Sequence, residues 1–316
     1  MATFLSSALA VAALLQAPAL VPGDSLDALR ARVAADSGDA KAWFALGQGL
    51  VRLSTGYHAH RAAGDTAWAR AILDTADQAF AKAGALYPGT AAADSARVFR
   101  VFTWADRALL AWELGGIEAA AQTWTTLPAD LKLPPVLEEL GENLLRACPR
   151  EGVLIAGTDA DAYAAWYLRF TRGLRPDVLI VPLAVWRGDT VYQDRVRKEL
   201  KLDRRPRTDA ADDGWMRVLA GRRPLCASMV FDRPPGTRAR VSWNVRPLVW
   251  VAGQEAKQDR VPPRDFVFAA LRLALDQHDT WAAPALDVYR RAAALTPALC
   301  DALATFQLKS EVGCRK

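Results

Sequence analysis

The chain has 316 residues, of which 52% are hydrophobic and 24% charged, and its formal net charge is +5. This length and composition are ample for roughly two domains with packed cores and a polar surface. The positive charge is too weak to indicate nucleic-acid binding without a clustered patch, so we expect no nucleic-acid partner.

Residues 1–22 are predicted to be a signal peptide. The sequence has no charged residue before Asp24, and its apolar stretch from Phe4 to Ala17 is too short to span a bilayer. Ala17-Pro18-Ala19 follows the small-residue cleavage rule loosely, and the usual basic residues at the start are missing. We therefore expect an exported, periplasmic or extracytoplasmic protein that is soluble once processed.

Four cysteines permit disulfide bonds in an exported protein, and they allow three different pairings. Cys300 with Cys314 closes a short C-terminal loop and is the favoured pair, and a pair of Cys148 with Cys226 is possible but less strongly indicated. No cysteine or histidine spacing typical of a structural zinc site occurs, so we expect no metal and no cofactor.

Residues 23–147 are predicted to form pairs of helices. The first helix of the clearest pair carries Trp43, Leu46 and Gly47 at helical spacing. The second carries Ala76, Phe80, Ala83 and a closing Pro88.

This pattern resembles the tetratricopeptide repeat (TPR), with about 17 extra residues between its helices. A weaker second pair is predicted over residues 95–126, and a further helix over 135–146. The resemblance implies a module that binds a protein or peptide. The alternative is that the helices serve only as a packing platform.

Residues 148–260 predict a small α/β domain built on one β-α-β unit. A strand from Val153 to Ala156 leads into a helix that ends at Gly173, and a second strand runs from Val178 to Val181. Further strands are expected over 225–231 and 241–251, and a helix over 190–202. Residues 261–316 predict helices packed on this domain, over 264–277, 279–295 and 297–306. The fold class is therefore mixed, α+β or α/β.

The candidate functional turn of this unit comprises Gly157, Thr158, Asp159 and Asp161. Thr158 and Asp161 have the spacing of a helix capping box, which is the interpretation we favour. An Asp-x-Asp pair could instead hold a divalent ion in a nucleotide-sugar glycosyltransferase, but helices stand where such enzymes need a nucleotide-binding half. A haloacid-dehalogenase-like phosphatase, with Asp212 and Asp213 as later acids, needs its first Asp directly after the strand. An anion at the helix N-terminus would be repelled by the two acids.

Residues 152–253 also resemble the soluble C-terminal part of bacterial O-mannosyltransferase-like membrane proteins. The likeness rests first on Gly157 with Asp159 and Asp161, then Trp166-Tyr167-Leu168, then Arg175-Pro176-Asp177-Val178. Further on, Arg223-Pro224-Leu225 and the stretch from Trp243 to Ala252 resemble the next strand and the last strand of that region. In that family the transferase chemistry is expected in a multi-span membrane part that is not present in this sequence. The resemblance implies an extracytoplasmic accessory domain and carries over no catalytic residue.

A basic patch is predicted at Arg195, Arg197, Lys198, Lys201, Arg204, Arg205 and Arg207. A solvated helix face explains it most simply, and the functional alternative is contact with a glycan or an anionic membrane surface. No Ser/His/Asp set and no glycine-rich phosphate loop occurs, so we name no catalytic residue. We expect an exported, non-catalytic interaction or scaffold protein of the cell envelope. The alternative is a divalent-metal-dependent enzyme that acts on a sugar or nucleotide-sugar through Asp159 and Asp161.

Overall fold

The computed structural model describes residues 25–60, 66–201, 214–236, 240–253 and 261–314, and the side chains of 55–60 are not among the described features. The predicted signal peptide therefore lies outside the described residues, as do Arg204, Arg205, Arg207 and the Asp212–Asp213 pair. Within the described residues, α-helices surround a five-stranded mixed sheet, which confirms the mixed fold class.

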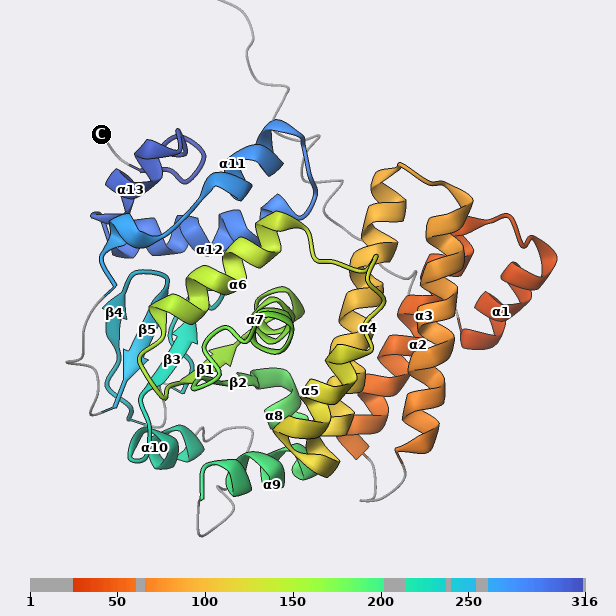
Figure 1. Cartoon of the computed structure of the whole chain (residues 1–316), viewed down its shortest axis with the longest axis horizontal. Helices are drawn as coiled ribbons and strands as arrows, with labels where there is room; N and C mark the ends of the chain where they lie inside the picture. The colour runs from red at the N-terminus through yellow and green to blue at the C-terminus, as the bar shows by residue number, and fades with distance from the viewer. Residues whose placement is uncertain (1–24, 61–65, 202–213, 237–239, 254–260, 315–316) are drawn as a thin grey trace, which may run out of the picture.

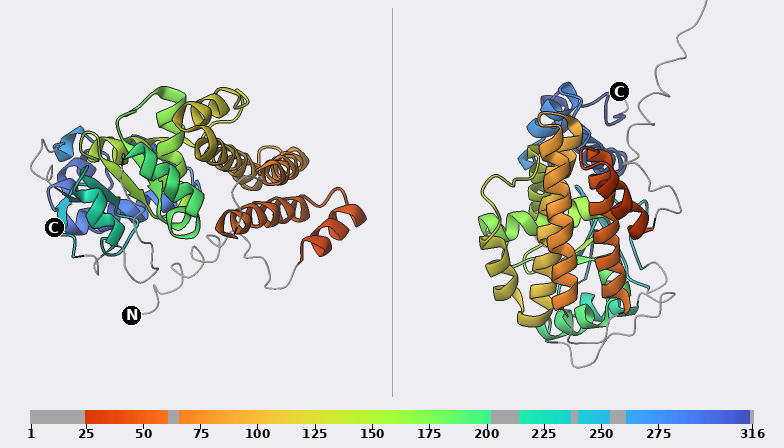
Figure 2. Two further views of the ribbon diagram at one scale, coloured as in Figure 1. Left: turned by 90° about the horizontal axis from the view of Figure 1, so that it is seen from below. Right: turned by 90° about the vertical axis from the view of Figure 1, so that its right-hand side faces the viewer.

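The first five helices form a layer beside the sheet (Figure 1). They are α1 (Leu26–Ala35), α2 (Ala40–His60), α3 (Ala67–Leu86), α4 (Ala91–Gly115) and α5 (Ile117–Thr125). Each packs on the next along the chain, and α1–α3 project from the side of the molecule (Figure 2). Part of the segment inserted between the two helices of the first pair simply lengthens α2, which continues to His60.

The sheet has the strand order β2-β1-β3-β5-β4. Its strands are β1 (Val153–Ala156), β2 (Leu179–Pro182), β3 (Leu225–Ser228), β4 (Asn244–Arg246) and β5 (Val249–Ala252). β1 pairs in parallel with β2 and β3, and every residue of these three strands is buried, as expected of parallel strands covered on both faces. β2 lies at an edge of the sheet and ends at Pro182, which has no N–H to donate.

The sequence suggested one strand region over 241–251, which Pro247 would only bend, and this prediction is wrong in its connection. β4 and β5 are instead two antiparallel strands, with Arg246 opposite Val249. The chain reverses at Pro247 and Leu248, and Leu248 has a positive φ of 69°. β5 pairs antiparallel with β3 and so runs against the three parallel strands, while β4, antiparallel to β5, runs in their direction again.

Several expected elements have different ends in the structure. The strand that begins at Leu225 ends at Ser228, and α9 (Thr190–Glu199) is three residues shorter than expected. The helix expected over 264–277 is a short 3-10 turn (Pro263–Asp265) followed, after an irregular segment, by α11 (Ala269–Asp276).

The remaining helices pack around the sheet and on one another. They are α6 (Pro135–Ala147), α7 (Asp159–Arg172), α8 (Leu183–Gly188), α10 (Gly214–Ala220), α12 (Ala282–Leu295) and α13 (Leu299–Thr305). α7 packs on β1 and β2, and α6 packs on α7, α11 and α12. One cluster of buried hydrophobic side chains runs from Val98 in α4 to Val312. The boundary expected between residues 147 and 148 lies inside this cluster, and the division into domains stays a prediction.

Candidate functional site

The candidate functional turn joins the carboxyl end of β1 to α7, and its centre is the buried side chain of Asp161. One carboxylate oxygen of Asp161 accepts from the Thr158 N–H (2.8 Å) and the Thr158 hydroxyl (2.8 Å). The other accepts from the Gly157 N–H (3.1 Å). The Thr158 hydroxyl in turn accepts from the Asp161 N–H, so the capping box expected from the sequence is present.

Asp161 also receives a hydrogen bond from Ser228, at the end of β3. Its side chain is 1% exposed, and burial raises its pKa although these hydrogen bonds act in the opposite direction. The carboxylate therefore links the turn after β1 to the neighbouring strand. None of its hydrogen bonds requires a ligand.

Asp159 lies at the start of α7 and is exposed to solvent. Protein atoms around it still remove part of its hydration, and this desolvation, together with the charge of Asp161, raises the pKa of Asp159. Titratable groups with raised pKa values are enriched at functional sites. Asp159 combines a raised pKa with an exposed side chain, and this makes it the acid of the turn that is open to a ligand.

A buried polar pair lies behind the turn. The hydroxyl of Tyr163 on α7 donates a hydrogen bond to Asp106 on α4. Burial raises the pKa of Tyr163 well above its ordinary value, and the charges of Asp106 and Asp159 act in the same direction. Phe102 on α4 contacts the Tyr163 ring edge to face, with centroids 5.2 Å apart, and contacts the Trp281 ring at 5.8 Å. These contacts connect the helical layer, the β-α-β unit and the C-terminal helices.

The order in which the chain adds parallel strands to the sheet reverses between β1 and β3, because β2 lies on one side of β1 and β3 on the other. Ligands of parallel sheets bind at the carboxyl ends of strands at such a point. Here the side chains of Val230 and Phe231 come so close to Gly157 that a Cβ there would lie 2.6–2.8 Å from them. Arg291 holds the same segment by donating to the carbonyls of Met229 (3.3 Å) and Val230 (2.9 Å). Protein side chains therefore occupy the space directly above Gly157.

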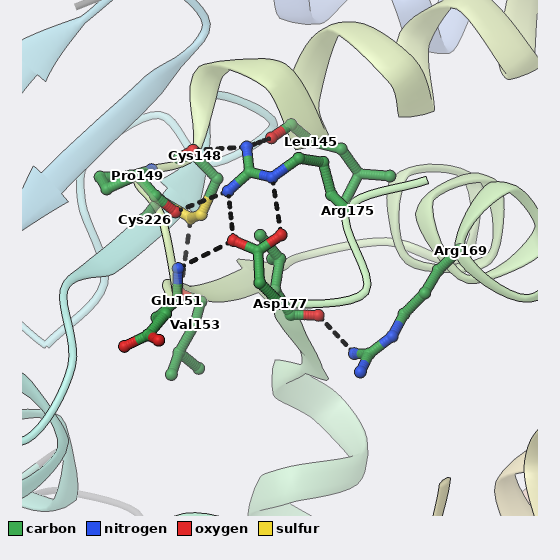
Figure 3. The surroundings of a disulfide bond; sticks show 10 residues. Leu145, Cys148, Pro149, Glu151, Val153, Arg169, Arg175, Asp177 and Cys226 are labelled. Carbon is green, nitrogen blue, oxygen red and sulfur yellow. Dashed lines mark hydrogen bonds and ion pairs between the residues drawn. A yellow bond between two sulfur atoms is a disulfide. The ribbon is translucent and has the colours of Figure 1, made fainter. Parts of the chain in front are cut away.

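The other end of the parallel strands carries a second polar centre, shown in Figure 3. The guanidinium of Arg175 donates to the carbonyls of Leu145 (2.7 Å), Cys148 (3.0 Å) and Pro149 (2.9 Å). It also forms a two-pronged ion pair with Asp177, and this pair holds the Asp177 pKa well below its usual range. Its carbonyl contacts lie at the C-terminal end of α6, beside the Cys148–Cys226 disulfide. We interpret this centre as structural: Arg175 fixes the end of α6 to the segment that leads into β2.

The basic patch is only partly within the described residues, and there it is divided. Arg195 donates to the carbonyls of Glu113 (3.2 Å) and Leu114 (2.6 Å), which end α4. Arg197 forms an ion pair with Asp194 at 3.8 Å. Lys198 and Lys201 are exposed. Arg195 and Arg197 therefore have intramolecular roles.

Sequence patterns identified the turn but not its long-range partners. Ser228 bonds Asp161, Asp106 bonds Tyr163 behind the turn, and Arg291 holds the segment after β3. No local spacing signals these contacts. Asp106 itself gives no clear signal, because α4 also carries other charged side chains, such as Arg100 and Arg107. Among the residues that the structure describes, no group of three His, Cys, Asp or Glu side chains is arranged to hold a metal ion.

No known protein family matches the chain, and no characterised protein or solved structure is significantly similar to it. In the described part of the chain, no helix is both long enough and apolar enough to cross a membrane.

Proposed function

We propose that the chain is an exported, non-catalytic interaction protein of the cell envelope whose tetratricopeptide-like helix pairs bind a protein or peptide partner. The packing of α2 on α3 supports the likeness to such repeats. Gly47 on α2 lies against the Phe80 ring, where an added Cβ would be 2.7 Å from a ring carbon. Phe80 is fully buried, and Leu46 and Ala83 are 5% exposed. Close helix approach at a small residue is what this repeat pattern requires.

The observation that carries the proposal is an apolar end of the α3–α4 pair. Ala69 and Leu73 on α3 cluster with Leu110 on α4, so the antiparallel pairing brings the start of α3 to the same end as the close of α4. Two large apolar side chains are exposed there, Trp68 (40%) and Leu114 (50%). Aromatic and aliphatic side chains exposed together are typical of protein-binding surfaces.

Site-specific cross-linking tests this proposal. A photoreactive benzoyl-phenylalanine would replace Trp68 or Leu114 in the full chain, which is produced and cross-linked in intact cells of its source organism. A third variant with the probe at Leu295, which is 46% exposed at the end of α12, is the matched control. We expect both helical positions to form an adduct with the same envelope protein and the control position to form none. Equal adducts at all three positions, or none at any, would contradict the proposal.

The second candidate function is the metal-dependent enzyme acting on a sugar or nucleotide-sugar. The observation in its favour is the exposed Asp159, with its raised pKa, at the carboxyl edge of the parallel strands. Against it stands Asp161, whose two oxygens already accept hydrogen bonds from the turn. A metal at this position would have to replace those bonds. The response to divalent ions separates the two functions.

A further inference from the structure

The N-terminus of α11 is capped by a side chain from a distant helix. Its own N-cap residue, Phe268, provides no capping side chain, so its first N–H groups need other partners. Glu139 on α6 supplies them. Its two carboxylate oxygens accept from the N–H groups of Ala270 (2.7 Å) and Leu271 (3.0 Å).

Two more side chains on the same face of α6 hold the segment that precedes α11. Asn143 exchanges hydrogen bonds with the Val267 backbone, donating to its carbonyl (2.6 Å) and accepting from its N–H (3.3 Å). Asn143 also donates to the Tyr289 hydroxyl at 3.0 Å. Arg146 donates to the Asp265 carbonyl at 3.4 Å. Residues 139, 143 and 146 lie along one face of α6. Their side chains form a row of hydrogen bonds to residues 265–271.

The charge on Glu139 has no cationic partner among the described residues. The neighbouring arginines bind other acids: Arg146 pairs with Glu142, and Arg272 pairs with Asp276 and Glu311. On the adjoining α7, Arg172 pairs with Glu138.

The other titratable groups that act on Glu139 do not stabilise its charge. Glu142 on α6 repels it, and Tyr289 on α12 faces it as a neutral phenol whose own pKa is raised, chiefly by burial. Glu139 is only 9% exposed, so water does little to stabilise its charge. The groups that mainly stabilise the charge are the N–H groups of α11.

We propose that Glu139 is a proton-controlled clasp, which holds α11 and the segment before it tightly while protonated and loosens when it ionises. Protonation weakens the bond from one of the two α11 N–H groups, because only the carbonyl oxygen stays a strong acceptor. It also removes the buried charge, and the cost of burying that charge is the larger effect. Burial raises the pKa of Glu139 to about 7, although the α11 N–H groups act in the opposite direction.

The direction of the pH effect follows from this shift. The unfolded chain holds a proton on Glu139 less tightly than the folded chain does, because the ordinary pKa of a glutamate side chain is 4.5. The stabilisation is therefore complete below about pH 4.5 and is lost as the pH rises through about 7. The clasp tightens on acidification.

The test compares urea unfolding of the full chain with that of Glu139→Gln between pH 5 and pH 8. Glutamine has the shape of the protonated acid and never ionises. We expect the unfolding constant of the natural chain, divided by that of the variant, to rise at least about tenfold over this range. Glu118→Gln, which removes an exposed acid on α5, is the control and should leave the ratio nearly constant.

Hydrogen exchange of the Ala270 and Leu271 amides locates the effect and needs no variant. After correction for the intrinsic pH dependence of exchange, their protection in the natural chain should fall as the pH rises. A pH-independent ratio of unfolding constants would overturn the clasp. Protection at these two amides that does not change with pH would overturn it as well.

Discussion

Asp161 shows how one buried carboxylate can define a turn. Its two oxygens accept from the backbone of Gly157 and Thr158, and the amide of an asparagine could replace only one of them. We expect Asp161→Asn to lower the free energy of unfolding by about 1–2 kcal/mol, because one N–H of the turn loses its acceptor. Urea denaturation at neutral pH measures this loss.

Asp159→Asn is the matched control, two residues away on the exposed side of the same helix start. It should change the free energy of unfolding by less than about 0.5 kcal/mol, since exposed substitutions rarely do more. Equal losses in the two variants would show that the buried position of Asp161 is not what matters.

The residues of this turn were predictable only as far as local spacing reaches. Thr158 and Asp161 are three residues apart, and that spacing alone predicts the capping box. The hydrogen bond from Ser228 and the Tyr163–Asp106 pair join residues that are 67 and 57 positions apart (228 minus 161, and 163 minus 106). Contacts of this kind depend on how the helical layer and the sheet come together, and no periodicity in the sequence encodes them.

At the scale of the element, the α2–α3 pair depends on a glycine. A Cβ at Gly47 would lie 2.7–2.9 Å from three atoms of the Phe80 ring, and that ring is fully buried between Phe44 and Phe99. We expect Gly47→Ala to lower the free energy of unfolding by about 1–3 kcal/mol through overpacking.

Gly84→Ala on α3 provides the opposite expectation in the same helix pair. A Cβ there would meet its nearest neighbours, Ala93 and Ala96, at 3.8 Å, which is ordinary contact. Alanine should therefore stabilise the chain by about 0.5–1 kcal/mol through its higher helix propensity. Thermal unfolding of both variants checks the pair, and destabilisation by Gly84→Ala would contradict the packing described for α3.

Element types followed from periodicity, whereas element ends did not. Continuous apolar runs identified β1 and β2, and helical spacing identified α2–α5. The hairpin at Pro247 was missed because a proline in an apolar run can mark either a bend or a reversal. The start of α11 was also missed, because its cap is a side chain of α6 and not a residue of its own first turn.

At the scale of the whole molecule, two disulfides close loops of very different length. Cys148–Cys226 spans 78 residues and joins the end of α6 to β3, while Cys300–Cys314 spans 14 residues, and both pairs considered from the sequence are present. In the chain-entropy model the longer loop contributes about 4–5 kcal/mol and the shorter about 3 kcal/mol.

We therefore expect replacing Cys148 and Cys226 by alanine to destabilise the chain more than replacing Cys300 and Cys314. Urea denaturation of the two double variants under non-reducing conditions gives the comparison. The reverse order would mean that the C-terminal loop contributes more than its length implies.

The largest feature that sequence patterns did not reveal is how the parts are joined. A boundary at residue 148 was expected from the change of pattern, yet α4, α6 and α12 contribute to the same buried cluster as the sheet. Arg195 on α9 also ends α4 through the carbonyls of Glu113 and Leu114. The helical layer is thus anchored on the sheet through α4, and the surface proposed to bind a partner lies where the end of α4 meets the start of α3.

The most direct test of the central claim, a non-catalytic protein whose Asp161 serves the fold, is thermal unfolding of residues 20–316 with and without Mn²⁺ or Mg²⁺ and a panel of nucleotide-sugars. A ligand at 100 times its dissociation constant would add about 2.7 kcal/mol and raise the midpoint by several degrees. We predict no change in the midpoint for the natural chain or for Asp159→Asn. A metal-dependent rise that Asp159→Asn abolishes would contradict the claim and favour the metal-dependent enzyme in its place.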